Sequence, residues 1–311
     1  MSNLDEEIKQ ILNDFYKKNY DKALKSLLPI TKKNPEYLFG LKILGAIYLQ
    51  MGKLSEALRV NNKVIEISPK DPEGHYNLAI NLKAMNNITG SIKAYNNAII
   101  LKSNYVEAYN NLGLIFLEIE KFKEAKSYFI KTLSLLSGSS SYTAFINLGN
   151  TYKKLGDFKN AIDSYKKAIT SNNKIPEGHF NLGIVYLIIG DIENSEFYFK
   201  KAISLKNDYT DAHRQLSLIK KYKISDNHFS SLKRLYSDPK LSINQKCHIN
   251  FALAKAYDDT EQYEMAFKHY YEGNQQRKKI LNYTIDVDIN LFENIKKINY
   301  SNKTYNSMFD D

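Results

Sequence analysis

The sequence has no tryptophan and one cysteine, Cys247, among its 311 residues. A single cysteine cannot form a disulfide within the chain, which fits a reducing compartment such as the cytoplasm. No stretch approaches the roughly 18 consecutive apolar residues that span a membrane. Residues 1–7 are acidic and lack the pattern of a signal peptide. These absences predict a cytoplasmic protein that has no membrane partner.

Arginine is scarce as well, although the chain is basic overall. Lys plus Arg number 44 against 34 Asp plus Glu, which gives a net charge of +10, and arginine occurs only at Arg59, Arg214, Arg234 and Arg277. A basic balance favours polyanionic partners. The lysines nevertheless alternate with glutamates, as in residues 118–126, a pattern typical of a solvated helix surface. Most aromatic residues fall at helix-packing positions, where they cannot stack on bases. We therefore expect no nucleic-acid partner.

Catalytic and metal-binding patterns are also missing. Gly52 and Lys53 are followed by Leu54, so they do not form a Walker-type phosphate loop. Three histidines occupy the same position in a repeated unit: His75, His179 and His213. Neighbouring units lie about 8–10 Å apart, too far for two imidazoles to reach one ion at about 2 Å. The sequence therefore predicts no metal, no cofactor and no enzyme activity of the chain itself.

A repeat is what the sequence does contain. Four near copies of one segment, at residues 75–79, 109–113, 145–149 and 179–183, read HYNLA, YNNLG, FINLG and HFNLG. Their spacing of about 34 residues is the period of the tetratricopeptide repeat (TPR). Apolar residues recur every three or four positions in both halves of each unit, which predicts two helices per unit. The predicted fold class is all-α, a right-handed superhelical TPR solenoid of antiparallel helix pairs.

The unit starts define the domain organisation. They fall at Leu38, Pro72, Val106, Tyr142, Pro176 and Thr210, at intervals of 34, 34, 36, 34 and 34 residues. The longer interval contains residues 137–141, which we interpret as a loop insertion. We predict a capping repeat over residues 1–37, five TPR units over 38–209, degenerate TPR-like helices over 210–298 and a disordered tail over 299–311. The whole is expected to form one elongated array.

The capping repeat differs from the others in its first helix. It carries Glu7, Gln10 and Asp14 at positions where the other units have apolar residues. The outermost helix of a repeat array needs a polar outer face. We therefore expect all three side chains to belong to that outer face.

The candidate binding residues lie opposite the packing face. On a helical wheel, Asn111 points roughly 160° away from the apolar sector of its helix. The equivalent residues are Asn77, Asn147, Asn181 and, one unit further on, Gln215. A side-chain amide offers donors and an acceptor in one plane and so matches the backbone of an extended peptide. The alternative is that a chain rich in asparagine places it at any exposed position.

Acidic residues recur near the starts of the first helices. They are Glu73, Glu107, Glu177 and Asp211. A negative charge at a helix N-terminus stabilises the helix. The same residues could instead line an acidic groove for a basic peptide, and the sequence favours neither interpretation.

Two resemblances refine the expectation. The asparagine row resembles the ladder that grips the substrate backbone in the TPR superhelix of O-linked N-acetylglucosamine transferase. This resemblance implies the same role for Asn77, Asn111, Asn147 and Asn181. Residues 251–259 and 266–274, continuing into 277–279 and 288–292, resemble the repeat region of bacterial TPR-sulfotransferases, in which a protein-tyrosine-type sulfotransferase domain follows. The phosphate-binding loop of that domain is absent from this chain.

The expected function is a non-catalytic scaffold that binds an extended protein segment in its concave groove. The second resemblance implies that it presents substrate to a sulfotransferase catalytic domain, or that the chain is the N-terminal portion of such an enzyme. A chaperone-type adaptor is a further alternative. It requires a clamp for two carboxylates, for which Lys42 is suitable but Ala46 and Glu107 are not.

Overall fold

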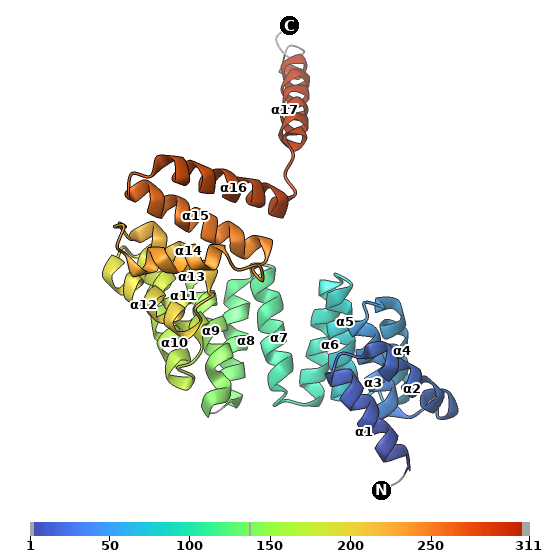
Figure 1. The fold of residues 1–311 in the computed structure, drawn as a ribbon. Coiled ribbons are helices and arrows are strands. Elements are labelled where there is room, and N and C mark those ends of the chain that lie inside the picture. Colours follow the sequence, from blue (N-terminus) through green and yellow to red (C-terminus); the bar gives the residue numbers. More distant parts are fainter. Residues whose placement is uncertain (1–2, 137, 307–311) are drawn as a thin grey trace. The chain divides into compact units, whose positions relative to one another are not determined.

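The structure is a computed structural model that describes residues 3–136 and 138–306. Within these residues every regular element is a helix, with 17 α-helices, one short 3-10 helix and no strand (Figure 1). The predicted all-α fold class is thereby confirmed. None of the helices in the described part of the chain is both long and apolar enough to cross a membrane.

The chain divides into two compact units, residues 1–173 and 174–311, where the sequence predicts a single array. In a repeat protein each hairpin contacts only its neighbours, so the chain can divide at a junction between two hairpins. Each unit is therefore described by itself.

The first unit consists of five helical hairpins. Their helices are α1 (Asn3–Tyr16), α2 (Tyr20–Lys33), α3 (Leu38–Gln50), α4 (Leu54–Ile67), α5 (Pro72–Ala84), α6 (Ile88–Leu101), α7 (Val106–Glu118), α8 (Phe122–Leu135), α9 (Tyr142–Lys154) and α10 (Phe158–Ser171). The 3-10 helix, Gly138–Ser141, lies in the predicted loop insertion. Residue 137 of that insertion lies outside the described residues.

The second unit begins with a regular hairpin and becomes irregular. Its helices are α11 (Pro176–Ile188), α12 (Ile192–Leu205), α13 (Thr210–Ile219), α14 (Asn227–Tyr236), α15 (Ile243–Asp259), α16 (Tyr263–Leu281) and α17 (Ile285–Asn306). All six predicted unit starts are confirmed, because α3, α5, α7, α9, α11 and α13 begin at those residues. The tail prediction is corrected for residues 299–306, which continue α17. Once a helix has formed, each further residue adds a hydrogen bond at little cost. Residues 307–311 lie outside the described part.

Glycines in the first helix of a hairpin allow an aromatic ring of the second helix to touch its backbone. A Cβ added to Gly113 would lie 2.6 Å from the ring of Phe129, and one added to Gly149 would lie 2.6 Å from Tyr165. The hairpin of α11 and α12 repeats the contact, at 2.7 Å between Gly183 and Phe199. All three rings are fully buried. The small residues predicted at the helix crossings therefore make room for the largest core side chains.

In the capping hairpin of α1 and α2, the prediction of a polar outer face was wrong for one of its three residues. Glu7 and Gln10 are exposed on α1 as predicted, but Asp14 is buried. The Asp14 carboxylate accepts hydrogen bonds from Gln10 Nε2 and Lys22 Nζ, both at 3.1 Å. A buried carboxylate needs such donors, and Lys22 on the following helix supplies a charged one. Position within the repeat could not reveal this local pairing.

The glycine–ring contact predicts the effect of adding one methyl group. Gly149→Ala should lower the free energy of unfolding by about 1–2 kcal/mol, because overpacking against Tyr165 costs up to about 3 kcal/mol while alanine adds about 1 kcal/mol of helix propensity. Urea unfolding followed by circular dichroism measures the change. The control Lys159→Ala, at an exposed position of α10, should stay within about 0.5 kcal/mol of wild type. A Gly149→Ala variant as stable as the control would contradict the account.

Candidate functional site

The structure distributes the five predicted binding residues over the two units. Asn77, Asn111 and Asn147 lie on α5, α7 and α9 of the first unit, and Asn181 and Gln215 lie on α11 and α13 of the second. We call this shared place on each first helix the ladder position. All five side chains are half-buried, so none is a core residue. Half-burial leaves open which of their hydrogen-bonding atoms are available to a ligand.

The Asn111 amide already has two acceptors. Its Nδ2 donates to the hydroxyls of Tyr76 and Tyr95, both at 3.1 Å. Burial raises the pKa of both tyrosines, so their hydroxyls stay protonated at neutral pH. Because an amide nitrogen has two protons, both donors of Asn111 are used within the protein. Only its Oδ1 is left to accept a hydrogen bond from a ligand.

Asn147 is partly engaged in the same way. Its Nδ2 donates to Asn110 Oδ1 at 3.2 Å, which leaves one proton and the Asn147 carbonyl oxygen. Asn110 directly precedes the ladder residue of its own helix, as Tyr76 does. A ladder amide therefore bonds to the residue before the ladder position in the preceding repeat, whenever that residue can accept. We call that residue the pre-ladder residue.

This rule is the signal that the sequence reasoning missed. The pre-ladder residue of the repeat before Asn77 is Lys42, which cannot accept a hydrogen bond. For Gln215 it is Phe180, which is apolar. Among the residues that the structure describes, none is hydrogen-bonded to the side chain of Asn77 or Gln215. The residue one position before the ladder position in the preceding repeat therefore decides the role of each ladder amide. Where that residue can accept a hydrogen bond, the amide bonds to it, and where it cannot, the amide remains available.

Asn77 borders an open groove within the first unit. The groove has a volume of about 260 Å³ and is lined by Leu12, Phe15, Tyr16, Phe39, Lys42, Ile43, Ala46, Glu73, Tyr76, Asn77 and Tyr105. Three successive first helices, α1, α3 and α5, supply most of these residues. Tyr16 is 78% exposed and Phe39 is 49% exposed. The Asn77 amide therefore lies beside aromatic surface that has no cover within the described chain.

The charges at this groove are balanced locally. Lys42 Nζ lies 2.6 Å from Asp71 Oδ2 and 2.8 Å from Glu73 Oε2. Burial would lower the pKa of Lys42, but its contacts with the two carboxylates outweigh that effect and raise the pKa. Lys42 is thus committed to an internal ion pair. This counts against the carboxylate clamp of a chaperone adaptor and shows that Glu73 also serves a structural contact.

Gln215 borders a different pocket, within the second unit. The pocket has a volume of about 320 Å³ and is lined by Asp211, Arg214, Gln215, Cys247, His248, Phe251 and Arg277. It is formed by α13, α15 and α16. Two of the four arginines of the chain meet here, which the sequence reasoning did not anticipate because they are 63 positions apart.

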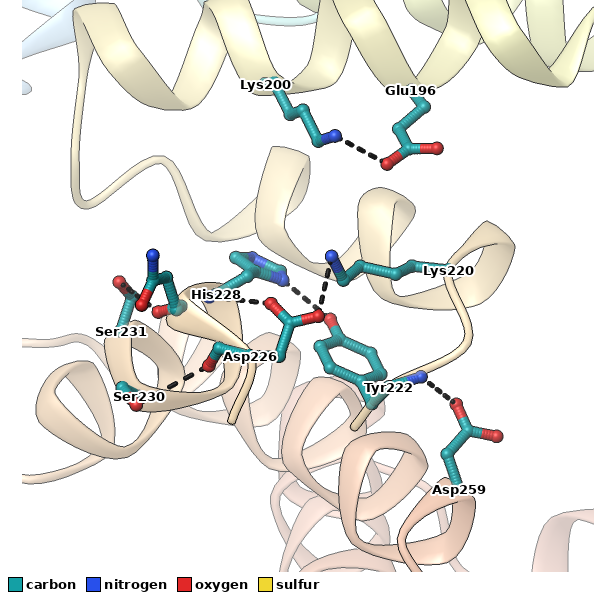
Figure 2. A network of polar contacts seen from close by, with 10 residues as sticks. Glu196, Lys200, Lys220, Tyr222, Asp226, His228, Ser230, Ser231 and Asp259 are labelled. Atoms are coloured by element: carbon teal, nitrogen blue, oxygen red, sulfur yellow. Dashed lines mark hydrogen bonds and ion pairs between the residues drawn. The ribbon is translucent and has the colours of Figure 1, made fainter. Parts of the chain in front are cut away.

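The irregular part of the second unit is held by a buried chain of hydrogen bonds through His213, His228 and Tyr222, of which Figure 2 shows the bond between His228 and Tyr222. His213 Nε2 lies 2.9 Å from the carbonyl oxygen of Asn207 and must donate to it. His213 Nδ1 then accepts from His228 Nε2 at 2.8 Å, and His228 Nδ1 accepts from the Tyr222 hydroxyl at 2.7 Å. When both histidines are neutral, each of these three hydrogen bonds has one donor proton and one acceptor. The two imidazole rings are stacked, 5.0 Å apart.

Ion pairs and backbone contacts fix the segment around this chain. Lys220 Nζ lies 2.7 Å from Asp226 Oδ2, and the other Asp226 oxygen accepts from the His228 backbone N–H at 3.0 Å. The Tyr222 backbone N–H donates to Asp259 Oδ2 on α15 at 3.1 Å, as Figure 2 shows. These contacts connect residues 220–226, which form no helix, to α14 and α15.

Two of the three histidines at the repeated position, His75 and His213, are hydrogen-bonded to a backbone carbonyl oxygen. His75 Nε2 lies 2.9 Å from the Pro69 carbonyl oxygen, as His213 does from that of Asn207. Within the described residues no group of three or more His, Cys, Asp or Glu side chains could hold a metal ion.

Two models of the repeat match this chain. The model described as "TPR repeat" matches residues 45–83, 81–119 and 149–190, and the model described as "Tetratricopeptide repeat" matches residues 106–135 and 176–209. These ranges include most of the hairpins described above. The chain therefore contains tetratricopeptide repeats over these residues.

The relatives are repeat proteins too. A TPR repeat-containing protein of Methanocaldococcus jannaschii is 28% identical over 195 residues, which is 56% of this chain and 34% of the relative. The BBSome complex member BBS4 homolog of Drosophila melanogaster is 28% identical over 164 residues, 51% of this chain and 33% of the relative. The chain spans about a third of the length of these curated relatives.

Solved structures agree on the fold alone. The C-terminal part of a TPR repeat-containing protein from Cytophaga hutchinsonii has a TM-score of 0.59 at 13% identity, covering 83% of this chain and 98% of that chain. Pseudomonas aeruginosa pilF has a TM-score of 0.54 at 16% identity, covering 73% and 95%.

The buried histidine chain predicts a loss of stability in acid. Burial lowers the pKa of His213, and burial together with the neighbouring His213 lowers that of His228 to about 3. Both stay neutral in the folded state while the unfolded chain takes up protons below about pH 6.5. The contribution to stability is therefore complete above that pH and is lost as the pH falls. Below about pH 5.5, where His228 is protonated in the unfolded chain but not in the folded one, it contributes a slope of about 1.4 kcal/mol per pH unit.

His228→Gln isolates this contribution, because glutamine keeps an acceptor and a donor but does not titrate. Urea unfolding at a series of pH values should show the slope reduced by about 1.4 kcal/mol per unit between about pH 5.5 and 4.5. Asn227→Gln, at an exposed position of α14 that carries no titratable group, is the control and should leave the slope unchanged. An equal slope in wild type and His228→Gln would refute the neutral chain.

Proposed function

We propose that the first unit binds an extended protein segment in the groove of α1, α3 and α5, with the Asn77 amide bonded to the backbone of that segment. The observation that carries the proposal is the unengaged, half-buried amide beside the exposed rings of Tyr16 and Phe39. A half-buried amide loses water on one side and gains most from a partner that offers both a donor and an acceptor. A peptide backbone offers both at every residue.

The ladder residues have different roles in this proposal. Asn77 offers its whole amide, Asn111 offers Oδ1, and Asn147 offers Oδ1 and one proton. The binding row is thus shorter than the sequence suggests and is strongest at the N-terminal end of the unit. Specificity comes from the apolar floor, where Leu12, Phe15 and Phe39 favour an apolar or aromatic side chain of the segment.

The relatives support the general class, since TPR arrays display extended surfaces for protein partners and one relative is named as a member of a complex. Binding of a protein partner as a scaffold is therefore the level at which fold and relatives agree. Neither the repeat models nor the relatives described above give support to a sulfotransferase. That association, and the chaperone-type adaptor, remain predictions from the sequence. Reading the gene beyond codon 311 for a phosphate-binding loop tests the first.

The groove can be tested without a known partner. Peptides selected from a random library on the intact protein would be labelled, and their affinity measured by fluorescence anisotropy. We expect Asn77→Ala to weaken binding about tenfold, the loss of roughly one hydrogen bond to a partly buried partner. Phe39→Ala should weaken it by a similar factor through lost apolar contact.

The matched control is Asn97→Ala, which removes the same amide from α6, outside the groove. It should leave both affinity and unfolding unchanged. If no peptide is selected, or if every selected peptide binds Asn77→Ala and Phe39→Ala as tightly as the control, the proposed groove is wrong.

A further inference from the structure

The second unit contains a polar pocket that the proposed function does not use. It is lined from α13 by Asp211, Arg214 and Gln215, from α15 by Cys247, His248 and Phe251, and from α16 by Arg277. Its volume, about 320 Å³, is enough for a small charged group together with ordered water.

The two guanidinium groups lack an internal counter-charge. Among the described residues, no carboxylate forms an ion pair with Arg214 or Arg277, although eight ion-pair contacts join lysines to carboxylates. The contrast with Lys42 is clear, since that cation has two carboxylate partners. Two unpaired arginines meeting in one pocket repel each other, and an anion between them would remove that repulsion.

The orientation of Arg214 is fixed by an aromatic ring. Its guanidinium lies over Phe251, 4.6 Å from the ring centre. A guanidinium held over an aromatic face is attracted by the ring and can still donate hydrogen bonds to a ligand. Arg214 therefore has less rotamer freedom to lose when a ligand binds.

The field of both arginines reaches the buried floor of the pocket. Burial raises the pKa of the Cys247 thiol, and Arg214 and Arg277 oppose that rise. Burial lowers the pKa of His248, Asp211 opposes this effect, and both arginines add to it. Both arginines therefore act electrostatically on the side chains of Cys247 and His248, which indicates that the two positive charges lie at one site.

Asp211 is the one negative group of the pocket. Its carboxylate is half-exposed and lies 3.6 Å from His248 Nδ1. It forms no ion pair with either arginine among the described residues. With His248 neutral, the charges of Arg214, Arg277 and Asp211 leave the pocket with a net positive charge.

We propose that this pocket binds a compact oxyanion, a carboxylate or phosphate group, between Arg214 and Arg277, with the Gln215 amide as an additional donor. Arginine forks match the two oxygens of either group, and charge-assisted hydrogen bonds are the strongest available. Gln215 is suited to this role because its pre-ladder neighbour, Phe180, offers it no hydrogen bond. The site is independent of the peptide groove of the first unit, so either can fail alone.

The scarcity of arginine makes a direct test possible. A spectrum of the arginine Nε–Hε groups of the intact protein should contain four signals, from Arg59, Arg214, Arg234 and Arg277. Titration with sodium phosphate at constant ionic strength should shift the signals of Arg214 and Arg277 along one saturating curve. Arg59 and Arg234 lie outside the pocket and serve as internal controls. A parallel titration with sodium acetate distinguishes a carboxylate site from one that accepts phosphate alone.

Substitutions identify the contribution of each group. Arg277→Gln should weaken phosphate binding, read at Arg214, by at least about tenfold, whereas Arg234→Gln should not alter it. Arg277→Lys keeps the charge without the fork and should fall between them. The proposal is overturned if all four wild-type signals move together without saturation in both phosphate and acetate, or if Arg277→Gln binds as wild type does. The wild-type titration decides the matter even if a variant does not fold.

Discussion

Contact between a glycine backbone and a buried aromatic ring is the constraint on which three of the regular hairpins depend. At Gly113, Gly149 and Gly183 the first helix has no side chain, so the ring of the second helix lies directly on its backbone. The contact brings the two helices close and directs the apolar face of the first helix toward the second. By the helical wheel, the ladder position lies on the opposite face of the first helix, where its side chains are half-buried.

That opposite face does two things at once. Asn111 and Asn147 bond to the preceding repeat and so help to hold successive first helices together. For Asn77, the pre-ladder residue of the preceding repeat is Lys42, which forms ion pairs with Asp71 and Glu73 and cannot accept a hydrogen bond. The Asn77 amide therefore remains available. One row of identical side chains is thus divided between stacking and binding by the residue that precedes the row in each repeat.

The helical hairpins of the regular repeats were predictable from the sequence. Because each repeat is a copy of the same helical hairpin, intervals of 34 residues and one of 36 predicted the first residue of six helices. The departures occur where a side chain meets a particular neighbour. Asp14 is buried because Lys22 and Gln10 reach it, and no repeat pattern contains that information.

The candidate site was less predictable from the sequence. Helical periodicity predicts that the ladder residues lie outside the packing core, and all five are half-buried, but their hydrogen-bond capacity depends on which residue the preceding repeat presents. Arg214 and Arg277 line one pocket, and His213 is hydrogen-bonded to His228. The helices that carry these residues are irregular in length and spacing. In that region the period ends, and only the folded chain shows which residues meet. The helical end of residues 299–306 was missed because local composition, poor in apolar residues, says little about a helix that begins upstream.

Photo-crosslinking tests the central claim, that the free ladder amide marks a peptide groove, most directly. A benzoylphenylalanine at position 39 would lie in the groove beside Asn77, and the same residue at position 197, an equally exposed phenylalanine of α12, would lie outside it. The account predicts that a peptide selected on the intact protein becomes covalently attached from position 39 and not from position 197. Attachment from position 197, or none from position 39, would contradict it.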